Sequence, residues 1–371
     1  NTFEFTKQGA AANAFNPAAN PNDIVLLAFG TKHVAIGNLT LSQLIFDGSY
    51  LVGLQSAKTY LQISENAKIK TAQEIKEIVI NSYGNVLLAD ESVKILENNK
   101  KILEKTLADT KEIFKNGLIE EENVEQLQIT LASLTSSLEN VKRQKRIAVD
   151  VLKLLLGIDL MEELVLIDQL NTLTQNNIDL VLLKKEFEAK NTIDYQIGKN
   201  IEKSKELLLK LEKSKALPSL AAQFNFGYNS FANQFDLANG SQKWNNFSNV
   251  GVGLNVPVFS SLGRSSRTQQ AKIALEQAKT SVTETEQKLK LQFAKAKSDY
   301  EFSIEQLATS KNNLNLAERI ESKNQIKFKE GLAGSFDLSE AQRQLYSAQQ
   351  SYLQAMLDVI NKKATLEKLV N

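Results

Sequence analysis

The longest tract without glycine or proline, residues 264–330, constrains the fold of this chain most strongly. It consists mainly of Lys, Glu, Gln, Ala and Leu, which favour helices. A helix of this length is on the order of 100 Å long, more than a compact domain can hold. Apolar or small residues recur along it at steps of three, four or seven, as in a coiled-coil seam. These residues are Leu275, Ala278, Val282, Leu289, Phe293, Ala296, Tyr300, Leu307, Leu314 and Ala317.

A second tract of this kind, residues 335–370, follows after only the four residues GLAG. A short break that contains glycine, placed between two long helices, predicts a helical hairpin. Ser335 is then the expected N-cap of the returning helix. Residues 49–156 have the same layout, with a break at Gly117. The sequence therefore predicts two long helical hairpins, at 49–156 and 264–370.

Between the hairpins, residues 218–259 are rich in Phe, Asn and Gly. Aromatic residues alternate with polar or small ones at 223–228, and aliphatic residues do so from Val250 to Val258. A period of two predicts strands with one apolar face and one small or polar face. We expect the apolar face to carry Phe224, Phe226, Tyr228, Val250, Val252 and Leu254.

Residues 1–46 form a matching strand pair in the sequence. Phe3 and Phe5 flank Glu4 in the first expected strand, and a loop with two prolines follows. Residues 34–48 then resemble residues 250–263.

The chain therefore reads as a duplication. The motif FKNGL at 114–118 returns as FKEGL at 328–332, and Phe46 has its counterpart in Phe259. We assign repeat 1 to residues 1–157 and repeat 2 to residues 158–371. Repeat 2 opens with a linker and a helix at 158–217. Its counterpart in repeat 1 would lie upstream of Asn1, so we expect repeat 1 to lack its N-terminal helix.

Composition argues against several classes of protein. The 44 basic and 43 acidic residues nearly cancel, which gives no footprint for nucleic-acid binding. Without cysteine there is no disulfide and no thiolate metal site. His33 is the only histidine, and the sequence contains no glycine-rich nucleotide-binding motif. We therefore expect no enzyme, no metal site and no cofactor.

No apolar run approaches the roughly 20 residues of a membrane-spanning helix, so any crossing must be made by strands. The polar strand faces carry Gly, Asn and Gln instead of Lys and Glu, as expected of a water-filled lumen. A soluble sheet can show the same alternation. Because four strands cannot close a barrel, the chain must then oligomerise, and two copies would give about 8 strands and three about 12.

The combined layout resembles the TolC family of outer-membrane efflux channels over essentially the whole chain. Its elements are the duplicated order of strands and helices, ALPSL at 216–220, VPVF at 256–259 and the two FKxGL turns. The resemblance implies a mainly α fold with membrane β-strands. It also implies a homotrimer with a 12-stranded outer-membrane β-barrel and a periplasmic helical tunnel.

The resemblance further implies a passive exit duct of a tripartite efflux or type I secretion system, in the outer membrane of a Gram-negative bacterium with a large periplasmic part. Its partners would be outer-membrane lipid, a periplasmic adaptor protein and, indirectly, an inner-membrane transporter. The alternative is a soluble helical pore-former or coiled-coil scaffold, which also uses long heptad helices.

The same resemblance places functional residues at the helix turns. The family's acidic pair falls on Asp337 and Glu340, where three copies would form a cation-selective ring at the periplasmic aperture. Alternatively, Asp337 only complements the helix dipole. Adaptor contact is implied for the two hairpin tips, whereas a Schellman cap is the structural alternative for their glycines. The tip residues are Gly117, Leu118, Gly331, Leu332 and Ser335.

Overall fold

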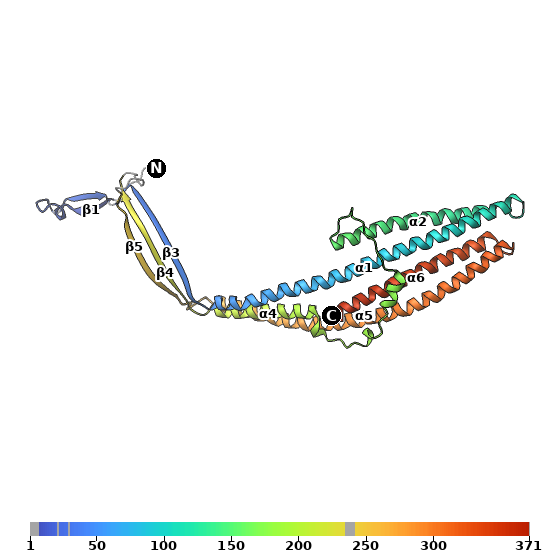
Figure 1. Ribbon diagram of the computed structural model, residues 1–371. Helices are drawn as coiled ribbons and strands as arrows, with labels where there is room; N and C mark the ends of the chain where they lie inside the picture. The colour runs from blue at the N-terminus through green and yellow to red at the C-terminus, as the bar shows by residue number, and fades with distance from the viewer. Residues whose placement is uncertain (1–6, 21, 29, 234–241, 371) are drawn as a thin grey trace. The chain divides into compact units, whose positions relative to one another are not determined.

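The computed structural model describes residues 7–20, 22–28, 30–233 and 242–370. Two compact units divide the chain (Figure 1). Unit 1 comprises Asn1–Lys58 and Lys205–Leu275, and unit 2 comprises Thr59–Ser204 and Glu276–Asn371. Each of the two sequence repeats contributes to both units, so the compact units do not follow the duplication.

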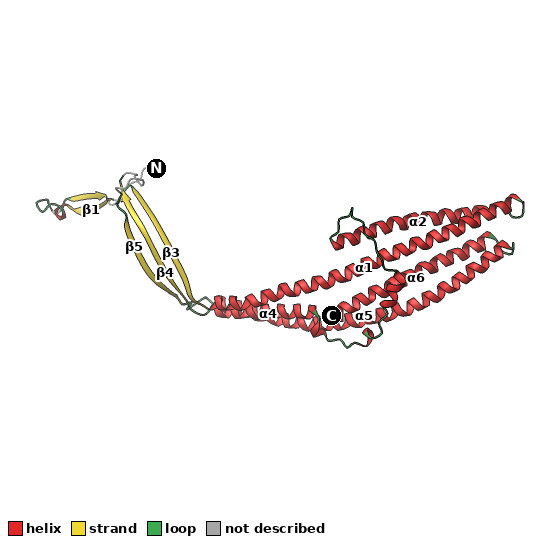
Figure 2. Ribbon diagram, in the orientation of Figure 1, coloured by secondary structure: helices red, strands yellow, loops and turns green. Residues whose placement is uncertain are grey.

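The strands lie in unit 1 (Figure 2). Three long antiparallel strands form one sheet in the order β3 (His33–Asp47), β4 (Ser219–Ala232) and β5 (Asn245–Asn255). A separate antiparallel hairpin joins β1 (Lys7–Ala11) to β2 (Ile24–Ala28). The strands predicted around residues 34–48 and 218–255 are therefore present.

Two details of the strand prediction differ from the structure. The last strand was expected to continue to Val258 but ends at Asn255, just before Pro257, which has no backbone N–H to donate to a ladder. The loop expected before residue 34 contains the β1–β2 hairpin and the 3₁₀-helix η1 (Ala12–Ala14). The strand predicted at Phe3 and Phe5 lies outside the described residues.

The long helices match their predicted ranges to within a residue or two. Hairpin 1 consists of α1 (Gly48–Lys115) and α2 (Glu121–Leu156). Hairpin 2 consists of α5 (Gly263–Lys329) and α6 (Ser335–Val370). The carboxylate of Asp47 starts α1, since its Oδ1 accepts hydrogen bonds from the N–H groups of Ser49 at 2.6 Å and Tyr50 at 3.1 Å.

Shorter elements connect the two hairpins. They are α3 (Leu170–Asn176), the 3₁₀-helices η2 (Leu182–Lys184) and η3 (Ala189–Asn191), and α4 (Ile193–Ser214). Tyr300 of α5 anchors this connection. Its hydroxyl donates to the carbonyl of Asn177 at 2.6 Å and accepts from the N–H of Asp179 at 2.8 Å. The tyrosine side chain itself is fully buried.

The core of unit 2 lies between the two hairpins. A cluster towards the hairpin turns combines leucines of α1 and α2 with Phe328 of α5 and Leu338 of α6. A second cluster joins Leu87, Leu353, Met356 and Ile360 to α3 through Leu170. Most residues of the predicted α5 seam are buried, including Leu289, Ala296 and Ala317. The heptad pattern therefore identified the packed face of this helix.

Gly84 of α1 marks a close approach between α1 and α6. A Cβ atom at this position would lie 2.5 Å from Cδ1 of Leu357, a buried residue of α6. At Gly53 a Cβ would meet nothing within 4 Å. We expect Gly53→Ala to stabilise the protein by about 0.5–1 kcal/mol through helix propensity. Gly84→Ala should gain nothing, and Gly84→Val should cost about 1–3 kcal/mol through overpacking.

Denaturation monitored by circular dichroism compares these variants. Equal midpoints for Gly53→Val and Gly84→Val would contradict the close approach, because the two substitutions have the same intrinsic propensity cost.

Candidate functional site: two hairpin tips and an exposed sheet face

Both hairpins turn through the same capping geometry. At the first tip, Gly117 N–H donates to the carbonyl of Phe114 at 2.8 Å, and Leu118 N–H donates to Ile113 at 3.2 Å. At the second, Gly331 and Leu332 make the equivalent bonds to Phe328 at 3.1 Å and Lys327 at 2.8 Å. Both glycines have a φ of 69°. This is the Schellman motif, which explains the two glycines by backbone conformation alone.

The leucines at the tips are not explained by the cap. A Schellman motif commonly buries the residue after its glycine against the last helical turn. Here Leu118 is 75% exposed and Leu332 is 78% exposed. Phe336, one turn further along hairpin 2, is 67% exposed. We call Leu118, Leu332 and Phe336 the tip patch. Its three large apolar side chains are displayed to solvent at the ends of the hairpins.

Ser335 does not have the role predicted from the sequence. It is buried and is the first residue of α6, whereas the carbonyl of Gly334 accepts the first helical hydrogen bond, from Leu338 N–H at 3.3 Å. Gly334 is therefore the N-cap. Its N–H donates to Oδ2 of Asp337 at 3.4 Å, as one half of a capping box. Because Ser335 is not accessible, we remove it from the candidate contact surface.

Polar contacts join the two tips. The Ser335 N–H donates to Oδ1 of Asn123 at 3.0 Å, and Thr130 Oγ1 donates to Ser339 Oγ at 3.2 Å. Beneath them, Leu127 of α2 and Leu338 of α6 are fully buried in the same core cluster. The ends of the two hairpins thus share one apolar core, and polar contacts join them at its edge.

The predicted acidic pair lies on the first turns of α6. Asp337 is exposed and Glu340 is half-buried, and their spacing of three places both on one helix face. Glu340 is ion-paired with Arg343 and also accepts from Gln344 Nε2 at 3.3 Å. Each copy therefore carries two carboxylates and one guanidinium at this position. Arg343 is a further charged residue of this site that the sequence prediction lacked.

A third carboxyl lies deeper in hairpin 2. Burial raises the pKa of Glu321, although a hydrogen bond from Gln342 opposes the shift. Burial, together with the charge of Glu321, also raises the pKa of Tyr346 to about 12. Gln342 is buried, and its Oε1 has no hydrogen-bond partner among the described residues. Glu321 is thus part of the helix interface, whereas Asp337 and Glu340 are the carboxylates on the first turns of α6.

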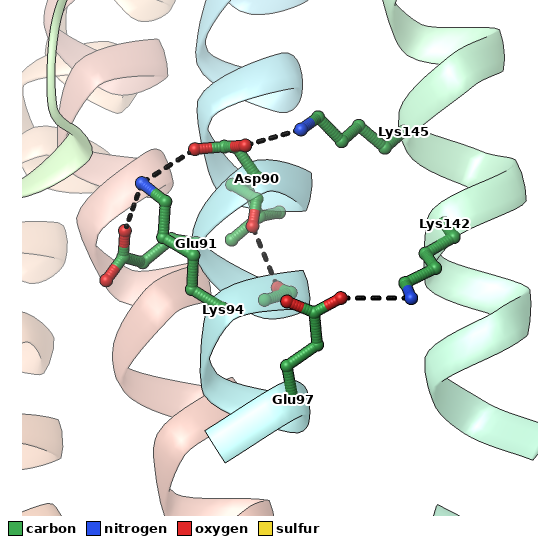
Figure 3. Close-up of polar contacts among 8 residues, drawn as sticks. Asp90, Glu91, Lys94, Glu97, Lys142 and Lys145 are labelled. Atoms are coloured by element: carbon green, nitrogen blue, oxygen red, sulfur yellow. Dashed lines mark hydrogen bonds and ion pairs between the residues drawn. The ribbon is translucent and has the colours of Figure 1, made fainter. Parts of the chain in front are cut away.

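Ion pairs connect α1 and α2 above the tip (Figure 3). Lys145 of α2 lies 2.5 Å from Asp90 of α1, and Lys142 lies 2.9 Å from Glu97. Partial burial opposes ionisation of Asp90, but hydrogen bonds from Lys145 and Lys94 outweigh it and hold the pKa of this carboxyl below its usual value. Ion pairs therefore stabilise the packing of α1 against α2, in addition to the buried leucines between them.

One face of the long sheet is apolar and exposed. In the register, Phe224 of β4 pairs with Leu41 of β3 and Val250 of β5, and directly paired residues share a face. All six residues predicted for the apolar face fall on it, and Val250 is 74% exposed. Leu39 and Leu41 lie on the same face and were missing from the prediction, although the alternation in residues 34–48 indicates them.

The opposite face carries amides and glycines. Asn225 Nδ2 donates to Asn249 Oδ1 at 2.8 Å, and Gln223 Nε2 donates to Asn225 Oδ1 at 3.3 Å. Neither β4 nor β5 contains a charged residue. On this face the ring of Phe247 covers Gly227, whose Cβ would lie 2.7 Å from it. The sheet thus separates an apolar face from a neutral, polar one.

In the described ranges, no three His, Cys, Asp or Glu side chains gather closely enough to hold a metal ion. Among the helices that the structure describes, none is both long and apolar enough to cross a bilayer.

Comparison with known proteins identifies this architecture. Residues 208–371 match the model of a family described as outer membrane efflux protein. No curated protein sequence matches the chain.

Several solved structures share the fold at low sequence identity. The outer membrane protein VceC from Vibrio cholerae is 14% identical with a TM-score of 0.71, and the match covers 91% of this chain and 87% of VceC. The CmeC outer membrane channel of Campylobacter jejuni is 16% identical with a TM-score of 0.72, over 99% of this chain and 76% of CmeC.

The open MtrE outer membrane channel of Neisseria gonorrhoeae is 15% identical with a TM-score of 0.64, over 91% of this chain and 80% of MtrE. The chain therefore has the fold of the TolC-like outer-membrane channels, and its residues 208–371 match the model of the outer membrane efflux protein family.

Proposed function

We propose that this chain is the protomer of a trimeric exit duct in the outer membrane of a Gram-negative bacterium. In this proposal it passively conducts substrates of an efflux system from the periplasm to the exterior. The observation that supports it most is the three-stranded sheet with one exposed apolar face and one neutral polar face. A sheet that separates lipid from water needs this division.

Oligomerisation follows from the sheet edges. Within the described residues, β3 and β5 are the outer strands of the sheet, and each has one edge without a partner strand. Open edges are not tolerated in lipid, because unpaired backbone groups have no water to bond. We infer that copies of the chain join edge to edge and close a cylinder of strands. With the four strands per copy that the sequence predicts, three copies would give about 12 strands and leave room for an aqueous passage, whereas two would give about 8 strands and be filled by side chains.

The tip patch would be the docking surface for a periplasmic adaptor protein, which connects the duct to an inner-membrane transporter. Exposed Leu118, Leu332 and Phe336 give this surface its apolar anchors. Large apolar side chains displayed in this way commonly mark a protein-binding surface. The Schellman glycines behind two of them fix the direction in which the leucines project.

A soluble helical pore-former or scaffold is the competing function. It would share the long heptad helices but has no need for a sheet with an exposed apolar face. Membrane fractionation separates the two. We expect the chain in the outer-membrane fraction, as trimers that resist SDS and dissociate on heating. A soluble monomer would end the duct proposal.

A matched pair of charge insertions tests the sheet directly. Val252 lies on the apolar face, and Asn249 lies on the polar face of the same strand. Val252→Lys should reduce assembled protein in the membrane, because a lipid-facing lysine costs about 2–4 kcal/mol near the midplane. Asn249→Lys should assemble normally and shift the conductance of single channels in planar bilayers. Equal assembly of the two variants would contradict the assigned faces.

A further inference from the structure

α2 and α5 are the outer helices of unit 2. Polar contacts join α2 to α1, α1 to α6, and α6 to α5, and Figure 1 shows these helices in that order. The contacting pairs are Lys145–Asp90, Asn99–Gln349 and Lys362–Asp299. Near the tip, α2 also reaches α6 through Thr130 and Ser339. Copies arranged in a ring would therefore meet through α2 of one copy and α5 of the next.

The outward faces of these two helices carry matching stripes of exposed residues, spaced alternately by four and three. On α2 the stripe is Ile129, Ser133, Ser136, Asn140, Arg143 and Ile147. On α5, in reverse order, it is Ile320, Leu316, Asn313, Thr309, Gln306 and Phe302. We call them the α2 stripe and the α5 stripe. This spacing is typical of the seam of a coiled coil, and the residues of both stripes are exposed in the described part of the single chain.

The apolar residues of the two stripes lie at similar distances from the hairpin tips, measured along the helices. Ile129 lies 8 residues from Glu121, where α2 starts, and Ile320 lies 9 residues from Lys329, where α5 ends. Ile147 and Phe302 lie 26 and 27 residues from the same ends. With a rise of about 1.5 Å per residue, the two apolar pairs fall at about 13 Å and about 40 Å above the tip.

Between these levels the chemistry also matches. Ser133 falls opposite Leu316, Ser136 opposite Asn313 and Asn140 opposite Thr309, in antiparallel register. A small residue thus faces a large one, and polar residues face polar residues. Ile129, Ile147 and Phe302 are each at least 60% exposed in the single chain, which is a high exposure for large apolar residues above the tips.

Charges beside the stripes are complementary. Arg146 borders Ile147 at 25 residues from the start of α2, and Glu305 borders Gln306 at 24 residues from the end of α5. Within the part of the chain that the structure describes, neither side chain makes an ion pair. The two opposite charges would meet at the same height as the Ile147–Phe302 pair.

We propose that the α2 stripe of one copy packs antiparallel against the α5 stripe of the next, with Ile147 against Phe302 and Arg146 paired with Glu305. The partner is a second copy of this chain. The inference rests on the proposed trimeric duct and specifies the surface that joins its helices. Each copy offers one stripe of each kind, so the contact repeats around the ring and closes it.

Disulfide crosslinking tests the register, because the chain contains no cysteine. The variant with both Ile147→Cys and Phe302→Cys should form covalent trimers on mild oxidation. The variant with Ile147→Cys and Ile320→Cys is the matched control, since its cysteines differ by 17 residues in height, about 26 Å. Cysteines more than about 7 Å apart at Cα cannot be bridged, so this control should remain uncrosslinked.

Charge exchange gives an independent readout. Arg146→Glu and Glu305→Arg should each lower the temperature at which the trimer dissociates in SDS, because each places like charges together. The double variant should recover most of the loss. Recovery is specific to the pairing, because two unrelated substitutions would add their effects instead.

The outcomes separate this inference from the function on which it rests. Trimers of the parent chain without crosslinking of the 147–302 pair, or equal crosslinking of both pairs, would overturn the proposed contact and leave the duct intact. Absence of any trimer in the parent chain would overturn the duct and the contact together.

Discussion

Replacing both tip leucines by aspartate, Leu118→Asp with Leu332→Asp, should abolish binding of the periplasmic adaptor. Both side chains are exposed, and the cap that holds each of them is made by backbone groups. The substitutions therefore leave the cap hydrogen bonds in place. Apolar anchors at the centre of an interface commonly contribute 2 kcal/mol or more each, so a loss of about 100-fold or greater is expected.

Co-purification of the adaptor from crosslinked cells measures the loss directly, and susceptibility to exported compounds measures its consequence. Met161→Asp is the matched control. Met161 is 94% exposed but lies in the connection after α2, away from both tips. Adaptor recovered equally with the double variant and with Met161→Asp would show that the tip patch is not the docking surface. Trimer formation should be the same in both proteins.

The helices could be predicted from the sequence because local signals and packing agree. Residues 264–330 combine high helix propensity with a heptad seam, and α5 is packed along that seam. The glycine breaks were equally clear, since a positive φ at Gly117 and Gly331 is a local requirement that side-chain packing does not change. The alternation of apolar and polar residues in β4 and β5 is likewise a local signal, and it predicted which residues lie on the apolar face of the sheet.

Other features depend on contacts that a sequence does not show. Ser335 is a good N-cap by residue type, but its N–H is taken by Asn123 of the other hairpin, and Gly334 caps the helix instead. The end of β5 at Asn255 depends on backbone pairing near Pro257. The order of the helices in unit 2 follows only from contacts between side chains distant in sequence, such as Asn99 of α1 with Gln349 of α6.

We propose that the acidic pair of α6 makes the periplasmic aperture cation-selective, and a test of this role must be separated from the capping contact of Asp337. Asp337→Ala removes both the charge and the acceptor for the Gly334 N–H, so any effect would combine the aperture with the helix cap. Asp337→Asn retains an acceptor oxygen and removes only the charge. Glu340→Gln likewise retains its hydrogen-bonding capacity beside Gln344. These isosteric changes test the electrostatic role alone.

Arg343 determines the size of the expected result. The parent chain has two carboxylates and one guanidinium here, a local charge of −1 per copy. The double variant Asp337→Asn with Glu340→Gln leaves Arg343 unpaired, a local charge of +1 per copy. A ring of three such sites should therefore shift selectivity from cations past neutrality towards anions. Adding Arg343→Gln should return the channel to weak selectivity.

Reversal potentials in planar bilayers under a potassium chloride gradient measure this sequence of shifts. Glu276→Gln is the control, because it removes one exposed carboxylate that pairs with Lys279 at 2.9 Å on α5, far from the tip. We expect the parent and the control to be cation-selective, the triple variant to be nearly unselective and the double variant to be anion-selective. A parent reversal potential retained by the double variant would mean that Asp337 and Glu340 do not line the conduction path. Asp337 would then serve only to cap α6.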